Sequence, residues 1–189
     1  MRKEHLMPTR ADYLKQPRET RLAQLECTPA ELAAAIRDQD DAVLSHRPDT
    51  KKWSAKEVVC HLRDIEEQFI LRFRTMLAMD DPKFLTLGDM PSNATEWGIG
   101  EGDSLPLDPD RWVEERQYLR NDTRLALAAF IKRRGETLVF LRRLTPEQWQ
   151  RGSMHTTLGR MTFSDWIALI AAHDDKHINQ LRRALEGRA

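Results

Sequence analysis

Residues 171–180 read Ala-Ala-His-Asp-Asp-Lys-His-Ile-Asn-Gln and carry two histidines, His173 and His177, four positions apart. Residues at that spacing project from one face of a helix, so both imidazoles point the same way. Two such imidazoles can bind one divalent metal, and a third ligand from another helix would leave a coordination position open for water. The residues between them are not those of HExxH, so the glutamate base of that motif is absent here.

The histidine pair continues an apolar stripe that predicts a C-terminal helix. Thr162 and Asp165 form a capping-box pattern at its start, and the stripe runs from Phe163 to Leu185. A second capping box, Ser54-Ala55-Lys56-Glu57, opens a helix predicted to reach about Met79. His61 lies within the apolar stripe of that helix, which makes it the candidate third ligand.

Two further helices complete the expected set. Thr28-Pro29-Ala30-Glu31 predicts a helix capped by Thr28 and ending at Arg47-Pro48. Asp108-Pro109 starts a long helix predicted to run to Leu144, with Gly135 as a point where it could bend. Residues 145–148 restart the chain as a short helical turn, and 151–161 form a linker with room for a strand-like hairpin.

Residues 80–108 interrupt the helical pattern with scattered glycines and prolines. A loop of that length in a compact domain is typically a functional lid or a disordered segment. Met90, Trp97 and Ile99 give it apolar residues to pack with, so we expect an ordered cover over one mouth of the site. Four helices with this loop between the second and third predict an all-α, up-down four-helix bundle with room for a cofactor between facing helices, in one domain, 1–189.

Composition excludes several classes of protein. The 189 residues include 30 basic and 30 acidic side chains, so the formal net charge of +0 favours neither nucleic acid nor an anionic membrane as a partner. The sequence contains no apolar run of the roughly 20 residues that span a bilayer, and residues 1–5 lack the apolar core of a signal peptide, so neither a span nor a signal peptide is expected. Cys27 and Cys60 are too few for a disulfide scaffold, so a cytoplasmic location is expected.

The three stripe histidines make a metal site the leading interpretation. Burying His61, His173 and His177 without partners would be costly, whereas a metal ion satisfies one nitrogen of each ring. Asp64 and Asp174 are the carboxylates expected to accept from the other nitrogens. The alternative for each histidine is an ordinary hydrogen-bonded core residue.

The other three histidines and the two cysteines give weaker indications of a functional site. His5, His46 and His155 fall in termini or loops and are expected at the surface. Cys60 is expected to be a small buried residue rather than a nucleophile. Cys27 precedes the helix start predicted at Thr28, where the helix dipole would lower a thiol pKa.

Two segments resemble the DinB/YfiT-like family. The run from Trp53 to Glu66, Trp-Ser-Ala-Lys-Glu-Val-Val-Cys-His-Leu-Arg-Asp-Ile-Glu, is similar to the family's second-helix motif. The spacing of His173, His177 and Gln180 resembles its fourth-helix motif, and the stretches 13–19 and 48–49 resemble the YfiT-like branch. The resemblance implies a four-helix bundle that binds one divalent metal ion, zinc or nickel, through His61, His173 and His177.

The resemblance also implies a choice of functions. Family members include thiol S-transferases that use low-molecular-weight thiols, metal-dependent hydrolases and proteins without a known reaction. Because a thiol brings its own nucleophile and no general base beyond Asp64 or Glu57 is evident, we expect thiol transfer to a small electrophile. Hydrolysis and a non-catalytic, metal-stabilised stress-response role are the alternatives. Arg63, Arg72 and Lys176 are candidates to bind the carboxylates of a thiol, and a homodimer is expected, as is common in the family.

Overall fold

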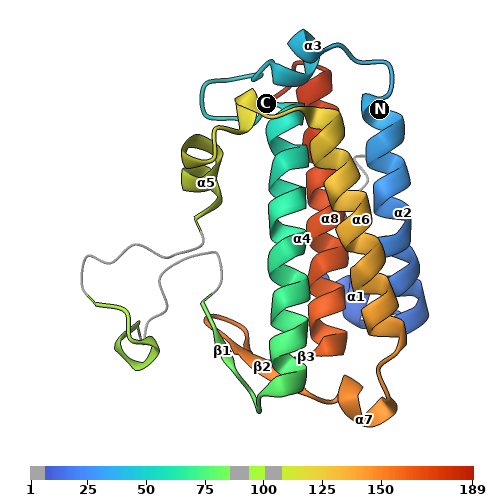
Figure 1. The fold of residues 1–189 in the computed structure, drawn as a ribbon, viewed down its shortest axis with the longest axis vertical. Coiled ribbons are helices and arrows are strands. Elements are labelled where there is room, and N and C mark those ends of the chain that lie inside the picture. The colour runs from blue at the N-terminus through green and yellow to red at the C-terminus, as the bar shows by residue number, and fades with distance from the viewer. Residues whose placement is uncertain (1–6, 86–93, 101–107) are drawn as a thin grey trace.

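The computed structural model describes residues 7–85, 94–100 and 108–189, and Figure 1 shows that they are mostly helical. Four long helices form the bundle: α2 (Arg18–Ile36), α4 (Ala55–Ala78), α6 (Thr123–Arg142) and α8 (Phe163–Leu185). The connecting helices are α1 (Arg10–Leu14), α3 (Asp41–Ser45), α5 (Pro109–Glu115), α7 (Pro146–Trp149) and the 3₁₀ turns η1 (Ala94–Trp97) and η2 (Tyr118–Arg120). The predicted all-α four-helix bundle is confirmed, with a small sheet added.

The four long helices do not pack in chain order. α4 and α2 each pack against both α6 and α8, so α2 and α4 lie at opposite corners of the bundle. Cys60 lies beside the carbonyl of Tyr118, and Phe73 stacks on Phe140 with ring centroids 6.3 Å apart, so α4 and α6 run in the same direction (Figure 1). The predicted up-down arrangement therefore does not hold for α4 and α6, because the long connection over residues 79–122 returns the chain to the end of the bundle where α4 begins.

The capping boxes predicted for α4 and α8 are both present. The Ser54 hydroxyl accepts from the Glu57 amide at 3.2 Å, and the Glu57 carboxylate accepts from the Ser54 amide at 2.7 Å. Thr162 and Asp165 make the same reciprocal pair at the start of α8. These caps fix where each helix begins, and therefore which face carries the histidines into the bundle.

The helix start predicted at Thr28 is wrong. α2 begins at Arg18 and runs through Pro29, so Cys27 lies inside the helix and not before its first turn. Pro29 has no N–H to donate to the carbonyl of Leu25, and Arg134 donates to that carbonyl instead at 3.0 Å. The predicted cap, Thr28, is buried and donates to the Asp174 carboxylate at 2.8 Å. α2 also ends at Ile36, before the predicted end at Arg47-Pro48, and the residues between them form the separate short helix α3.

The long helix predicted over 108–144 is also wrong, because it is three elements. α5 ends at Glu115, and Gln117 adopts the left-handed conformation with φ of 49°, which stops the helix. Asp122 then caps α6 by accepting from the Leu125 amide at 2.8 Å. Gly135 lies within α6, which continues past it to Arg142.

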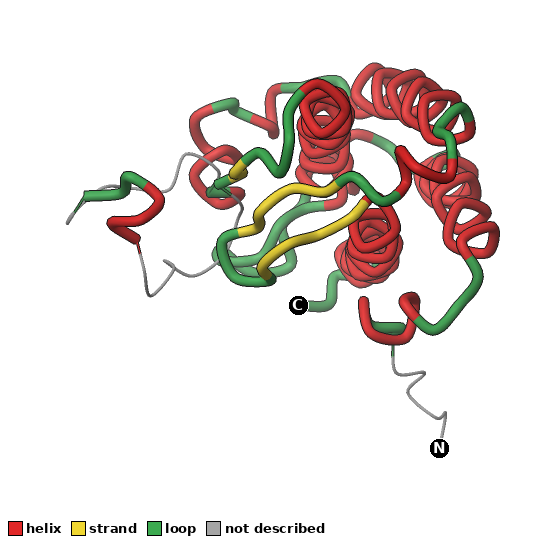
Figure 2. Tube along the Cα trace, turned by 90° about the horizontal axis from the view of Figure 1, so that it is seen from below, coloured by secondary structure: helices red, strands yellow, loops and turns green. Residues whose placement is uncertain are grey.

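The hairpin expected within 151–161 is present as β2 (Gly152–His155) and β3 (Gly159–Thr162), which pair antiparallel. The short strand β1 (Lys83–Phe84) adds parallel to β2. Figure 2 shows the hairpin lying across the lower end of the bundle. The Trp166 indole donates to the Ser153 hydroxyl at 2.9 Å, which attaches β2 to α8.

Candidate metal centre

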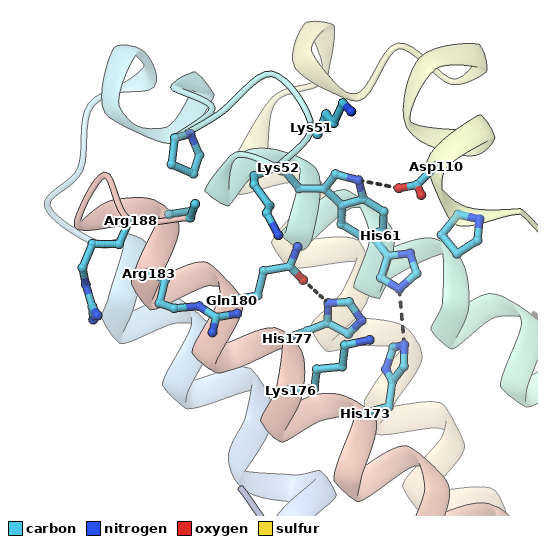
Figure 3. Close-up of a pocket in the computed structure, with 15 residues that line it drawn as sticks. Lys51, Lys52, His61, Asp110, His173, Lys176, His177, Gln180, Arg183 and Arg188 are labelled. Carbon is cyan, nitrogen blue, oxygen red and sulfur yellow. Dashed lines mark hydrogen bonds between the residues drawn. The ribbon is translucent and has the colours of Figure 1, made fainter. Parts of the chain in front are cut away.

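Three histidines from two neighbouring helices converge near the upper end of the bundle. His61 comes from α4, and His173 and His177 come from successive turns of α8. One nitrogen of each ring lies within 4.8 Å of the others. The Nε2 atoms of His61 and His173 face each other at 3.3 Å (Figure 3). Two imidazole nitrogens on one tetrahedral zinc ion at about 2.0–2.1 Å would lie about 3.3 Å apart, so this spacing suits a shared metal ion.

The hydrogen bond of His177 fixes which of its nitrogens can bind a metal. Its Nδ1 lies 2.8 Å from the side-chain oxygen of Gln180, one turn further along α8. An amide oxygen only accepts hydrogen bonds, so Nδ1 carries the proton and Nε2 keeps its lone pair. Gln180 therefore orients the His177 ring. Gln180 was named above only as part of the fourth-helix motif, although its i+3 spacing from His177 is typical of side chains that contact each other on a helix.

The three imidazoles are neutral at physiological pH. Burial holds the pKa of His61 well below its usual range, and His177, once protonated, and Lys176 lower it further. Burial and the neighbouring histidines lower the pKa of His173 in the same way. Burial and Lys176 lower the pKa of His177 to about 4. Neutral imidazole is the form that binds metal ions, so these donors are already in the required state.

The two predicted carboxylate partners bind other groups. Asp64 accepts hydrogen bonds from Arg63, Arg116 and Tyr118. Asp174 accepts from Arg134 and Thr28. The Nδ1 atoms of His61 and His173 are buried and have no hydrogen-bond partner among the described residues. The expected carboxylate–histidine contacts are therefore not made, because each aspartate is already bound to an arginine.

Glu57, the other carboxylate considered as a base, is also bound elsewhere. It closes the capping box with Ser54 and is paired with Arg47, so it is held at the start of α4 and away from the histidine nitrogens. Neither Asp64 nor Glu57 lines the histidine pocket.

Aromatic rings enclose the histidine cluster. The Trp53 ring lies 4.9 Å from that of His61 and stacks on that of His177 at 6.0 Å. Its indole N–H donates to Asp110 at 3.0 Å, which links the start of α4 to α5. Phe69 meets His173 edge-on at 6.2 Å. Trp53 was quoted above only as the first residue of a family-like motif, and its place beside the histidines was not predicted.

The cluster lies at the base of a cavity of about 600 Å³ that opens to solvent (Figure 3). Its walls come from the segment before α4, from the start of α5 and from the last turns of α8. Within the described parts of 80–108, no residue lines this cavity, and Met90 falls outside those parts. Trp97 instead packs with Lys83, and Ile99 is buried. The expected cover over the site is not formed by the described part of the loop.

The other residues singled out from the sequence lie elsewhere. Arg63 binds Asp64 and Asn121, and Arg72 donates to the carbonyl of Leu85, so neither reaches the cavity. Lys176 does line it. Cys60 is buried as expected, and burial raises the pKa of its thiol to about 11.

The expectation for the remaining histidines holds only in part. His46 is exposed as expected, and His5 lies outside the described residues. His155, expected at the surface, is buried in β2 with its ring 5.7 Å from that of Trp166, and burial lowers its pKa to about 4.

Comparison with known proteins gives consistent matches. The sequence profile of the DinB superfamily matches residues 24–181. A protein of Bacillus subtilis (strain 168) named "Putative metal-dependent hydrolase YfiT" is 25% identical over 170 residues, which cover 89% of this chain and 84% of that protein. The solved structure of YfiT from Bacillus subtilis, described as "a probable metal-dependent hydrolase with an unusual four-helix bundle topology", matches with a TM-score of 0.73 and 24% identity.

That alignment covers 93% of this chain and 90% of the YfiT chain, and at its level of identity it shows a shared fold. Among the described residues, no helix is both long and apolar enough to cross a membrane.

Proposed function

The chain belongs to the DinB superfamily, and from that premise we propose that it is a metal-dependent hydrolase whose ion is held by His61, His173 and His177. One observation carries the proposal: three neutral imidazoles bring a nitrogen each within 4.8 Å at the base of an open cavity. The name of the Bacillus subtilis relative supports hydrolysis over the thiol transfer expected from the sequence.

The donor set fits a divalent transition metal. Imidazole nitrogens suit zinc and nickel, and three ligands from one side leave further positions for water or substrate. Bound there, such an ion would polarise a carbonyl or phosphoryl oxygen and acidify water at neutral pH. The Nε2 atoms of His61 and His173 are already 3.3 Å apart, a spacing that suits two ligands of one ion, and the three donor atoms all lie within 4.8 Å of one another.

The described residues around the cluster orient the histidine rings and do not supply a general base. Gln180 holds the His177 ring by its Nδ1 proton, and Trp53 covers one face of the same ring. Outer partners of this kind typically change metal affinity by about 10–100-fold. No carboxylate of the described residues lies within hydrogen-bonding distance of the three histidines, so the residues around the cluster leave acidification of water to the ion.

Thiol transfer is the second candidate, and one observation favours it. Lysines line the mouth of the cavity, as expected for a protein that binds the carboxylates of a low-molecular-weight thiol. A thiol would need no general base, which agrees with the described lining, where the one acidic side chain, Asp110, accepts from the Trp53 indole. The third candidate is a metal-stabilised bundle without turnover.

One kinetic comparison separates the three candidates. The zinc- or nickel-loaded protein is incubated with activated esters and amides, with and without cysteine or glutathione, alongside His177→Ala and the exposed control His46→Ala. Hydrolysis predicts turnover in water alone that His177→Ala abolishes and His46→Ala retains. A rate that appears only with thiol would replace hydrolysis by transfer. Metal that raises the melting temperature without any turnover would leave the non-catalytic role.

A further inference from the structure

The cavity above the histidines is lined mostly by positively charged side chains, although the whole chain has no formal net charge. The whole chain has 30 basic and 30 acidic residues. The cavity lining, by contrast, includes five cationic side chains and one acidic side chain, Asp110, whose carboxylate accepts from the Trp53 indole. The cations are Lys51, Lys52, Lys176, Arg183 and Arg188. An uneven distribution of this kind, within a concave site, concentrates anions there.

Four of these cations have no acidic partner among the described residues. Arg188 pairs with Glu186, and Arg182, which precedes Arg183, pairs with Glu31. Arg183 itself, Lys51, Lys52 and Lys176 form no ion pair within the described part of the chain. Elsewhere on the helices, some arginines pair with a carboxylate, as Arg142 does with Glu26, while the unpaired ones, such as Arg72 and Arg124, are not gathered in one cavity. The cavity is therefore a place where positive charge is left uncompensated.

Lys176 lies on α8 between the two histidines of that helix and lines the cavity. Its charge contributes to lowering the pKa of all three histidines, and Figure 3 shows its side chain extending toward them from the turn between His173 and His177. An ammonium group and a divalent cation side by side repel each other unless an anion lies between them. In the same view, Lys52 and Arg183 extend toward Gln180, on the other side of His177.

We propose that this cavity binds an organic anion, with a carboxylate or phosphate group held by Lys176, Lys52 and Arg183 and the reacting group above the three histidines. The inference rests on the proposed function for the role of the histidines, but the anion site itself requires no metal. It narrows the substrates of the proposed hydrolysis to phosphate esters and to esters and amides that carry a carboxylate or phosphate group, so neutral esters and amides should be the slower substrates in the kinetic comparison above. The residues act by binding and orientation, since none of them needs to exchange a proton.

The test is an anion-binding measurement on the full chain, as purified and after chelator treatment, with circular dichroism as the check of folding. Isothermal titration uses inorganic phosphate, succinate and the uncharged analogue succinamide. The variants are Lys176→Gln and the double substitution Lys52→Gln/Arg183→Gln. Lys132→Gln on α6 removes the same charge outside the cavity and serves as the matched control.

We expect phosphate or succinate to bind in both metal states, and the tighter of the two identifies the anionic group. Lys176→Gln should weaken binding about fivefold and the double variant about tenfold, as for loss of solvent-accessible ion pairs, while Lys132→Gln stays within about twofold. Succinamide binding as tightly as succinate, no binding of either anion, or equal effects of Lys132→Gln and Lys176→Gln would each overturn the proposal. If the wild-type protein bound these anions but no metal ion, the proposed function would be refuted and the anion site would remain supported.

Discussion

Replacing Arg134 by Met is expected to destabilise the protein severely. Arg134 is 1% exposed in the centre of the bundle, where it donates to Asp174 at 2.5 Å and to Glu66 at 2.8 Å. Both carboxylates are equally buried, so the substitution leaves two buried acids without their cation. Breaking a buried pair in this way costs about 3–5 kcal/mol. In a chain of this size that corresponds to a melting temperature lower by about 6–20 °C.

The neighbouring residue provides the control. Arg133, on the same helix, pairs with Glu67 and Glu136 at the surface, and exposed pairs contribute less than about 1 kcal/mol, so Arg133→Met should lower the melting temperature by only a few degrees. Thermal and urea unfolding of both variants gives the comparison. Equal losses in the two variants would refute the reasoning.

The pH dependence of the Arg134→Met variant gives a second check. Burial raises the pKa of Asp174 even with Arg134 present, and loss of the guanidinium should raise it further. A group whose pKa is raised in the folded state loses stability as the pH rises through that pKa. The loss of stability in Arg134→Met should therefore become smaller as the pH is lowered from neutrality through the raised pKa of Asp174, and a loss that grows on acidification would contradict the assignment.

Three further outcomes are expected. Gln180→Ala should lower metal affinity about tenfold, measured by chelator competition, because the His177 ring loses its acceptor; unchanged affinity would remove Gln180 from the site. Burial lowers the pKa of His177 to about 4, so between about pH 6.5 and 4 this histidine binds a proton in the unfolded chain but not in the metal-free folded protein. The free energy of unfolding of the metal-free protein should therefore fall as the pH is lowered from about 6.5 to 4. Urea titrations that give the same free energy of unfolding over this range would contradict this. We also predict a homodimer through the exposed apolar residues Leu125, Ile131 and Val139 of α6, and light scattering that gives 22.0 kDa, the mass of one chain, would count against it.

Local sequence patterns predicted the helix starts that depend only on local contacts. The boxes at Ser54 and Thr162 each form within four residues, so the sequence alone contains both partners. The similar pattern at Thr28-Pro29 failed for a tertiary reason. Arg134, more than a hundred residues away, satisfies the carbonyl that Pro29 leaves free, and α2 therefore continues through the proline.

The sequence also predicted part of the candidate site. The apolar stripes placed His61, His173 and His177 on inward faces, and the bundle brings them together. Which carboxylates would reach the rings could not be predicted, because Asp64 and Asp174 each have closer arginines on other elements. Trp53 and the cavity mouth were missed because their position depends on how α5 meets the start of α4, which no local pattern specifies.

Metal content, measured by elemental analysis on untagged protein, tests the central claim most directly. The wild type should retain about one zinc or nickel ion per chain, with metal–nitrogen distances near about 2.1 Å by X-ray absorption. His61→Ala and His177→Ala should each lose most of that metal, while His46→Ala, with its exposed imidazole, should keep it. Metal content unchanged in both cluster variants would contradict the assignment of the three histidines as the metal site.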